Sequence, residues 1–274
     1  MTLSLTDFEY VRREVLERSA IVLGDDKLYL AAARLATLAR AEGHPSVQHL
    51  IAELRAGSGN GLHQRVVEAI ATHETSFFRD LHPFEALRKQ ILPELIARRA
   101  PLRTLNLWCA ACASGQEPFS VAMLIREHFP ALAGWKVRVL GSDIAADVLE
   151  RARQGRFSQV EVNRGLPARL LVKYFARVEG GWQIADCIRQ MVEFRPINLI
   201  GPWPALPPMD VVLLRNVMIY FDLATKQSLL ARVRQLLKAD GSLFLGAAET
   251  TLNIDDRFVR QQLDRAVWYQ MAHG

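Results

Sequence analysis

The segment TLNLWCAACASGQEPFSVAMLI, residues 104–125, decides the fold. Its apolar first part predicts a buried strand, and its last part has the apolar spacing of a helix. Between them lies a turn of small residues that contains one glycine, Gly115. A strand, a tight turn and a helix in this order form the ligand-binding turn of nucleotide-binding α/β folds. The segment therefore predicts a turn that faces a nucleotide or a nucleoside.

The residues of this turn argue against a diphosphate as its ligand. Turns that hold a diphosphate use the pattern G-x-G-x-x-G, whereas this turn has only Gly115. Glu117 follows in the first turn of the helix, where its carboxylate would repel a diphosphate and attract an ammonium group. We therefore expect a looser turn, with Glu117 facing a cation.

Strands and helices alternate after residue 104, and this pattern predicts an open, mostly parallel sheet with helices on both faces. The expected strands are 104–109, 136–142, 191–196, 209–215 and 241–247, and the expected helices are 116–129, 145–154 and 223–238. The final segment RFVRQQLDRAVWYQM predicts two strands that pair antiparallel across LDR. We interpret residues 104–274 as one α/β domain, with a small β-insertion at about 157–197 around a Gly-Gly turn.

The first 80 residues predict helices without strands, joined by short loops into a small N-terminal helical domain. Thr6 and Glu9 have the spacing of a capping box before the first helix. Ser46 is a candidate N-cap of the third helix, which Gly57 ends. Residues 81–103 then form a connecting helix and linker, and Pro93 interrupts that helix.

Composition places the 274 residues among ordinary globular proteins, with 50% hydrophobic and 23% charged residues. No apolar run approaches the roughly 18 residues of a membrane span, and the N-terminus does not read as a signal peptide. We therefore expect a cytoplasmic protein without direct membrane insertion.

The three cysteines, Cys109, Cys112 and Cys187, cannot form a disulfide framework and fit a reducing compartment. Cys109 and Cys112 form a lone C-x-x-C, and no second C-x-x-C or suitably spaced His pair completes a zinc site. We interpret these two cysteines as small residues beside the turn, and we expect no metal.

The net charge of +5 is unevenly distributed along the chain. Residues 1–80 carry 9 Lys/Arg and 11 Asp/Glu, whereas the remainder carries 25 and 18. The basic surplus therefore lies in the C-terminal two-thirds, and it indicates an acidic partner there.

Ligands of open α/β sheets bind beyond the carboxyl ends of the strands, so the residues after each strand are candidates for the site. Asp143 ends the second strand, where it could accept hydrogen bonds from both hydroxyls of a ribose. The alternative is an N-cap of the helix that follows. Together with the small-residue turn and Glu117, Asp143 favours a nucleoside without a diphosphate, such as S-adenosylmethionine, over NAD.

Arg215, Asn216 and Tyr220 follow the fourth long strand in DVVLLRNVMIYFD. They are candidates for the same site, and the alternative is that Arg215 neutralises Asp222 while Tyr220 packs in the core.

The segment THETSFFRD, residues 72–80, joins the helical part to the α/β part. Its phenylalanines, Phe77 and Phe78, are expected to pack the two parts together. Arg79 either forms a solvated salt bridge with Asp80 or contributes to a site at the seam between the parts.

These motifs resemble those of the chemotaxis receptor methyltransferases, the CheR-type protein-glutamate O-methyltransferases. The resemblance covers nearly the whole chain and is most specific in ETSFFRD and RNVMIYFD. It implies the class I S-adenosylmethionine-dependent methyltransferase fold, with an open, mostly parallel sheet whose last strand is antiparallel. The N-terminal helical domain and the β-insertion belong to the same pattern.

The resemblance also implies the site residues. Those that match the family's cofactor-binding residues are Thr75, Arg79, Glu117, Asp143, Asn198, Leu199, Arg215 and Asn216. Arg79 and Tyr220 match the residues that the family places near the methyl transfer. His73 stands where the family usually has Asn, and we include it among the cofactor-binding residues because an imidazole can still form a hydrogen bond.

The implied reaction transfers a methyl group from S-adenosylmethionine to glutamate side-chain carboxylates on the cytoplasmic helices of chemoreceptors. Its products are glutamyl γ-methyl esters, which serve sensory adaptation, and S-adenosylhomocysteine. The insertion's hairpin, RVEGGWQIA, looks shorter than in family members that dock a receptor's C-terminal tail peptide, so we do not expect such docking.

Two alternatives remain at the level of the sequence. The basic surplus also fits an RNA methyltransferase, although the chain has no N-P-P-Y-like motif and no basic stripe interleaved with aromatic residues, so nucleic acid is not the expected partner. The other alternative is a noncatalytic module that binds a nucleotide or a receptor and regulates signalling.

Overall fold

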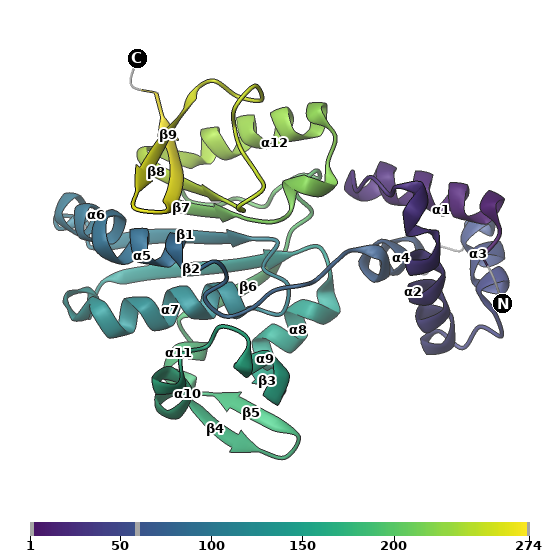
Figure 1. Ribbon diagram of the computed structural model, residues 1–274, viewed down its shortest axis with the longest axis horizontal. Helices are drawn as coiled ribbons and strands as arrows, with labels where there is room; N and C mark the ends of the chain where they lie inside the picture. The colour runs from purple at the N-terminus through teal and green to yellow at the C-terminus, as the bar shows by residue number, and fades with distance from the viewer. Residues whose placement is uncertain (1–2, 58–60, 273–274) are drawn as a thin grey trace.

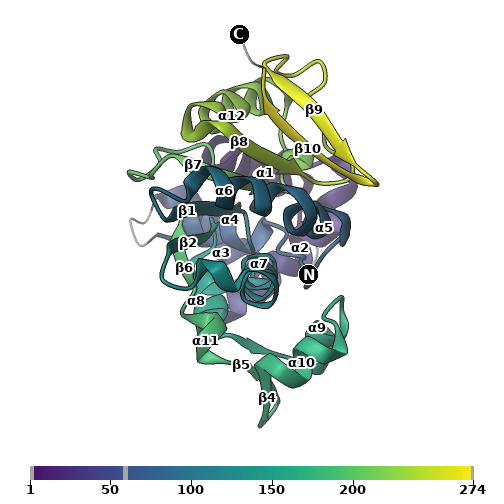
Figure 2. The ribbon, with the colours of Figure 1, turned by 90° about the vertical axis from the view of Figure 1, so that its left-hand side faces the viewer.

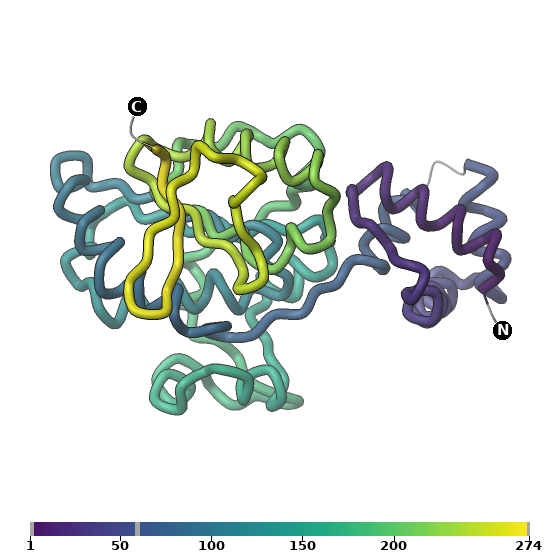
Figure 3. Tube along the Cα trace, turned by 45° about the horizontal axis from the view of Figure 1, so that its top comes forward, coloured from purple at the N-terminus to yellow at the C-terminus, as the bar shows by residue number. Residues whose placement is uncertain are grey.

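The computed structural model describes residues 3–57 and 61–272. Four helices near the N-terminus lie at one end of the molecule, and the α/β part lies at the other (Figure 1). An extended segment after the fourth helix connects the two (Figure 3).

Seven strands of the described residues form the main sheet, in the order β6-β2-β1-β7-β8-β10-β9. They are β1 (Thr104–Ala110), β2 (Lys136–Asp143), β6 (Val192–Pro196), β7 (Met209–Leu214), β8 (Leu237–Leu245), β9 (Phe258–Leu263) and β10 (Ala266–Met271). The first five of these are parallel, and β10 runs antiparallel to both β8 and β9. This confirms the predicted open, mostly parallel sheet with an antiparallel last strand.

Helices cover both faces of the sheet. The side chains of a strand alternate between the two faces, so each face has a hydrophobic core of its own. Leu105 and Leu107 of β1 belong to one hydrophobic core and Trp108 to the other. The first core includes residues of α7 (Gln116–His128), α8 (Ala146–Gln154) and the connecting helix; the second includes residues of α12 (Leu223–Leu236). Figure 2 shows α5, α6 and α7 in front of the strands, with α12 above them.

The connecting helix continues through Pro93, and the turn before it is π-helical. It consists of α5 (His82–Ala86), the π-helical turn Leu87–Ile91 and α6 (Leu92–Arg99). Proline has no N–H to complete the ladder of an α-helix, so the preceding turn widens instead of breaking. The predicted interruption at Pro93 is therefore a change of helix type.

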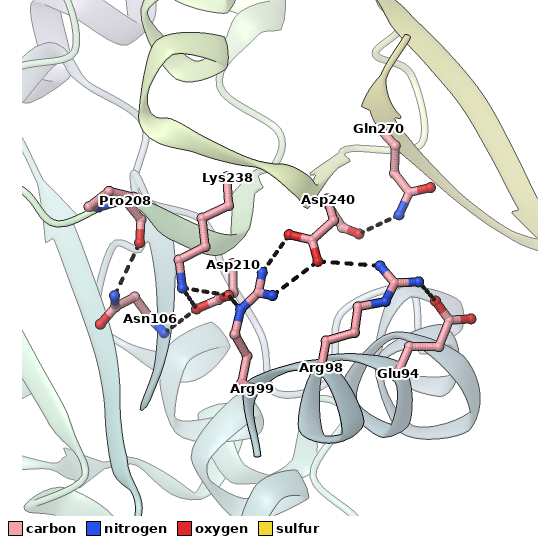
Figure 4. Close-up of polar contacts among 10 residues, drawn as sticks. Glu94, Arg98, Arg99, Asn106, Pro208, Asp210, Lys238, Asp240 and Gln270 are labelled. Carbon is pink, nitrogen blue, oxygen red and sulfur yellow. Dashed lines mark hydrogen bonds and ion pairs between the residues drawn. The ribbon is translucent and has the colours of Figure 1, made fainter. Parts of the chain in front are cut away.

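A buried polar cluster fixes α6 to the amino ends of the strands (Figure 4). The carboxylate of Asp210, which is fully buried, accepts from Arg99 Nε at 2.8 Å and from Lys238 Nζ at 2.8 and 2.9 Å. It also accepts from the Asn106 backbone N–H at 2.8 Å. Arg99 pairs with Asp240 as well, so one arginine joins the helix to two strands.

The N-terminal helices are α1 (Leu5–Ser19), α2 (Leu28–Ala41), α3 (Val47–Ala56) and α4 (Leu62–Ile70), and they share one hydrophobic core. Ser46 caps α3 as predicted, because its side chain accepts from the His49 N–H. The predicted capping box of Thr6 and Glu9 is wrong. Helix α1 begins one residue before Thr6, and Ser4 is the N-cap that accepts from the Asp7 N–H.

The β-insertion is a three-stranded antiparallel sheet with short helices. Its elements are β3 (Arg156–Phe157), α9 (Gln159–Asn163), α10 (Ala168–Tyr174), β4 (Phe175–Val178), β5 (Gly181–Ile184) and α11 (Asp186–Arg189). Short 3₁₀ turns elsewhere are Asp25–Lys27, Pro130–Leu132 and Met218–Tyr220.

Phe77 attaches this insertion to the rest of the molecule. It is fully buried, and its ring meets Phe157 and Phe175 edge-on at centroid distances of 5.0 and 5.6 Å. The sequence predicts that Phe77 packs the helical part onto the α/β part. In the structure Phe77 does pack in a core, but its partner is the insertion and not the helical part. Phe78 lies edge-on to Phe84 of α5 at 5.2 Å.

Candidate functional site

A cavity of about 840 Å³, counting its open mouth, lies where the carboxyl ends of β1, β2 and β7 meet the N-terminal helices. All ten residues predicted from the sequence line it. They are His73, Thr75, Arg79, Glu117, Asp143, Asn198, Leu199, Arg215, Asn216 and Tyr220.

The turn after β1 is tight, and three of its residues have backbone angles in the left-handed region. Ala111, Ala113 and Gly115 have φ values of 54°, 48° and 90°. A Cβ on Gly115 would lie 3.0 Å from Ala152 and from Phe194, so this glycine permits close packing of α7 against α8 and β6. Ala111 and Ala113, not the glycine, line the cavity.

Asp143 joins the end of β2 to this turn. Its buried carboxylate accepts from the Ala113 N–H at 2.9 Å and from the Ala145 N–H at 3.1 Å. The alternative that Asp143 is the N-cap of α8 is wrong, because Ala145 occupies that position. Asp143 thus lines the cavity with its orientation fixed by two backbone groups.

His73 lies between two acceptors. Its Nδ1 is 3.4 Å from Asp143 Oδ1, and its Nε2 is 3.1 Å from the Glu68 carbonyl oxygen. Only a doubly protonated ring can donate to both. Burial lowers the pKa of His73, but the Asp143 carboxylate and the Glu68 carbonyl outweigh burial, and the net pKa is raised.

Glu117, Arg215 and Asp80 form a charged chain beside the cavity. Arg215 Nη1 donates to Glu117 Oε2 at 2.6 Å, and Nη2 donates to Asp80 Oδ2 at 2.8 Å and to the Arg79 carbonyl at 2.9 Å. Burial raises the pKa of Glu117, although the charge of Arg215 opposes this effect. A second cation in the cavity would therefore stabilise the ionised form of Glu117.

These contacts correct two interpretations. Arg215 does not pair with Asp222, whose side chain instead accepts from the Thr225 N–H at the start of α12. Arg79 does not pair with Asp80; its Nη1 donates to the Glu74 carbonyl at 3.0 Å.

The segment after β7 brings Asn216 and Tyr220 to the cavity. Asn216 has a φ of 59°, and its backbone N–H donates to Glu249 at 2.7 Å. Tyr220 is half-buried, and it packs against the core while also lining the cavity, so both interpretations of this residue apply.

Asn198 and Leu199 follow β6, and Asn198 connects the α/β part to α1. Asn198 Nδ2 donates to the Arg18 carbonyl at 2.7 Å, and Asn198 Oδ1 accepts from the Ile200 N–H at 3.2 Å. The Leu199 carbonyl accepts from Arg232 Nη1 at 2.8 Å. Both residues also line the cavity.

Sequence reasoning missed several contributors. Ser19 and Ile21, at the end of α1, line the cavity, and no local pattern marks them because only tertiary packing brings them there. Glu249 holds the loop after β7, accepting from the backbone N–H groups of Asn216, Val217, Ile219 and Gly246. The sequence signal that could have identified Glu249 is its position as an acidic residue just beyond β8, comparable to that of Asp143 at the end of β2.

The cysteines beside the turn are buried thiols. Burial is the main cause that raises the pKa of Cys109 and of Cys112 well above the ordinary value. Within residues 3–57 and 61–272, no group of three or more His, Cys, Asp or Glu side chains is placed to hold a metal ion. In the same residues, no helix is both long and apolar enough to cross a membrane.

Two family models match the chain. The CheR methyltransferase SAM-binding domain matches residues 73–267, and the CheR methyltransferase all-alpha domain matches residues 6–71.

Curated relatives agree with these matches over nearly the full length. Chemotaxis protein methyltransferase 1 of Pseudomonas aeruginosa is 37% identical over 274 residues, covering 98% of this chain and 99% of the relative. Chemotaxis protein methyltransferase Cher2 of Pseudomonas putida is 36% identical, covering 96% and 97%. The chemotaxis protein methyltransferase of Escherichia coli is 34% identical, covering 94% and 89%.

Proposed function

Because the chain belongs to the CheR methyltransferase family, we propose that it methylates glutamate side chains on the cytoplasmic helices of chemoreceptors. The family and the fold make it a methyltransferase that uses S-adenosylmethionine. The main observation behind the proposal of glutamate methylation is that one cavity is lined by Glu117 and Asp143 as well as by Arg79 and Tyr220. The chemotaxis function in the names of the relatives supports the receptor as substrate.

The cavity residues fit S-adenosylmethionine. Glu117 is buried with a raised pKa, and the ammonium group of the cofactor would favour its ionised form. Asp143 is fixed by the Ala113 and Ala145 N–H groups, and its carboxylate would accept from the ribose hydroxyls. His73, Thr75, Asn198, Leu199, Arg215 and Asn216 line the remainder of the proposed cofactor site.

When bound, S-adenosylmethionine supplies an electrophilic methyl group. A glutamate carboxylate, with an ordinary pKa of about 4.3, is already ionised near neutral pH, so the protein needs no general base. Transfer of this methyl group to the carboxylate would give a methyl ester and S-adenosylhomocysteine. We propose that Arg79 and Tyr220 orient the reacting carboxylate, and that the walls of the cavity exclude water from it.

The decisive experiment incubates the protein with tritiated S-adenosylmethionine and either receptor cytoplasmic fragments or RNA. We expect base-labile, volatile label on the receptor fragment, as a carboxyl methyl ester gives. Label on RNA instead would favour an RNA methyltransferase. Absence of label on both, with intact cofactor binding, would favour a noncatalytic regulatory module.

We further propose that residues 1–80 and 104–274 act as two domains joined by residues 81–103, with the insertion at 157–197 as a subdomain. Only Glu179 and Gly180 separate β4 from β5, so the hairpin is compact. We expect receptor methylation without docking of a C-terminal tail peptide. A pull-down in which such a peptide binds with micromolar affinity would contradict this.

A further inference from the structure

A second cavity, of about 870 Å³ counting its open mouth, adjoins the first across Arg215. Its walls come from the start of α5, the loop after β8 and the β9–β10 hairpin. Arg215 lines both cavities, while Arg79 lines the first and Asp80 the second. Arg215 therefore lies on the boundary between the second cavity and the proposed cofactor site.

Two arginines of the hairpin give this cavity an excess of positive charge. Arg260 of β9 and Arg265 of the β9–β10 turn are exposed and line it. Neither side chain has a hydrogen bond or ion pair with another described residue. The two acidic residues of the lining are already engaged, Asp80 by Arg215 and Glu249 by four backbone N–H groups.

Arg215 adds an unsatisfied donor between the two cavities. Its side chain is 2% exposed. Both of its terminal nitrogens donate to acceptors, but its buried Nε has no partner among the described residues. A buried donor without an acceptor is rare in folded proteins, and a water, an ion or a ligand group can supply the missing acceptor.

We propose that the second cavity receives an acidic peptide segment, whose acceptor glutamate approaches the cofactor site past Arg215. Arg260 and Arg265 bind carboxylates that flank this glutamate on the same segment. A glutamate-rich helix presents such carboxylates, because residues three or four apart share one helix face. This proposal rests on the proposed function, and it assigns the side from which the substrate enters and the residues that recognise its charge.

The test compares Arg260→Ala, Arg265→Ala and the double variant with the wild-type protein. Methylation of a receptor cytoplasmic fragment is measured as base-labile tritium at several salt concentrations, and the affinity for S-adenosylhomocysteine is measured by calorimetry. We expect the double variant to lower kcat/KM by about tenfold, mainly through KM, because exposed charge pairs act on encounter and binding. Its salt dependence should be weaker, and its cofactor affinity should be unchanged.

Arg126→Ala is the matched control. Arg126 is exposed and unpaired among the described residues, and it lies in the last turn of α7, whose other end begins at the site. The Arg126→Ala variant should leave KM unchanged. This result would exclude a general effect of net charge on KM.

An unchanged KM in the double variant would overturn the assignment of this cavity while leaving the proposed function intact. Failure of the wild-type protein to label the fragment would instead contradict the proposed function. In that case, binding of the fragment to the protein saturated with S-adenosylhomocysteine still tests the cavity. RNA binding that depends on Arg260 and Arg265, with no fragment binding, would identify nucleic acid as the partner and refute the proposal.

Discussion

At the scale of single residues, Asp143 has one carboxylate that serves two purposes. It ties the turn after β1 to the end of β2, and it faces the cavity. We expect Asp143→Ala to weaken S-adenosylmethionine binding by about 10- to 100-fold, since hydrogen bonds to a charged group contribute roughly 1.5–3 kcal/mol. Calorimetry measures this loss. Glu150→Ala, at an exposed position of α8, is the control, and an unchanged affinity in Asp143→Ala would refute the assignment.

Arg79 and Tyr220 are predicted to act on the transfer step more than on cofactor binding. We expect Arg79→Ala and Tyr220→Phe to lower kcat by about 10- to 100-fold, because small errors in the position of reacting groups are costly. Affinity for S-adenosylhomocysteine should change much less. Tyr29→Phe, at an exposed position of α2, serves as the control for the tyrosine. Wild-type turnover in both variants would show that these residues are not catalytic.

His73 predicts a pH dependence of stability. Its folded pKa is raised above the ordinary value of 6.5, with Asp143 and Asp147 as the carboxylates that contribute. A group whose pKa rises on folding stabilises the protein below its unfolded pKa, and this stability is lost as pH rises through the folded pKa.

The free energy of unfolding of the wild-type protein, relative to His73→Asn, should therefore be largest below about pH 6.5 and should shrink above it. Urea denaturation at a series of pH values measures this difference. A difference that stays constant with pH would mean that folding leaves the pKa of His73 unchanged, and a difference that shrinks below about pH 6.5 would mean that folding lowers it.

At the scale of elements, the polar cluster around Asp210 secures α6 to the amino ends of the strands (Figure 4). We expect Asp210→Asn to lower the free energy of unfolding by about 1.5–3 kcal/mol, because the half-buried Lys238 and Arg99 lose a charged hydrogen-bond acceptor, although Arg99 keeps Asp240. Chemical denaturation measures the loss.

The cluster lies at the end of the sheet opposite the cavity, so the folded variant should retain its affinity for S-adenosylhomocysteine. Asp264→Asn is the control: Asp264 pairs with Lys89 at the surface, and its loss should cost less than about 1 kcal/mol. Equal stability of the two variants would refute a structural role for the cluster.

The order of the elements and most of their limits follow from the sequence, because burial on a strand or a helix leaves a local periodicity. The predicted strand 136–142 is Lys136–Asp143, and the predicted helix 145–154 is Ala146–Gln154. The clearest difference is β8, which begins at Leu237 instead of at 241, before a register shift against β7. A helix-like pattern up to residue 238 concealed the start of that strand.

At the scale of the whole molecule, the N-terminal helices close the cavity onto the α/β part. The Val22 N–H donates to the Tyr220 carbonyl at 2.8 Å, and Asn198 donates to the Arg18 carbonyl. Arg34 donates to the carbonyls of Ile70 and Ala71, and so fixes the beginning of the extended segment. A ligand in the cavity therefore contacts both parts.

Binding of S-adenosylhomocysteine should stabilise both parts together, by about 2.7 kcal/mol at a concentration one hundred times Kd. We expect slower amide hydrogen exchange at residues 16–22 and 71–79 as well as in the turn after β1. The β4–β5 hairpin, which does not line the cavity, is the internal control. Protection limited to the α/β part would show that the helical part does not contribute to the site.

The sequence by itself indicated the strand–turn–helix unit, the parallel sheet and the candidates Glu117, Asp143, Arg215, Asn216 and Tyr220 near strand ends, because strand ends and chemical types are local properties of the chain. Arg79 was a candidate from its place at the seam, and the resemblance to the CheR-type methyltransferases added His73, Thr75, Asn198 and Leu199. Only the tertiary structure decided the partners of the charges. Arg215 pairs with Glu117 and Asp80, which are 98 and 135 residues away in the sequence, and not with the nearby Asp222. Packing also brought Ser19 and Ile21 to the cavity and Phe77 beneath the insertion. Such contacts depend on how elements stack in space, and no periodicity along the chain records that stacking.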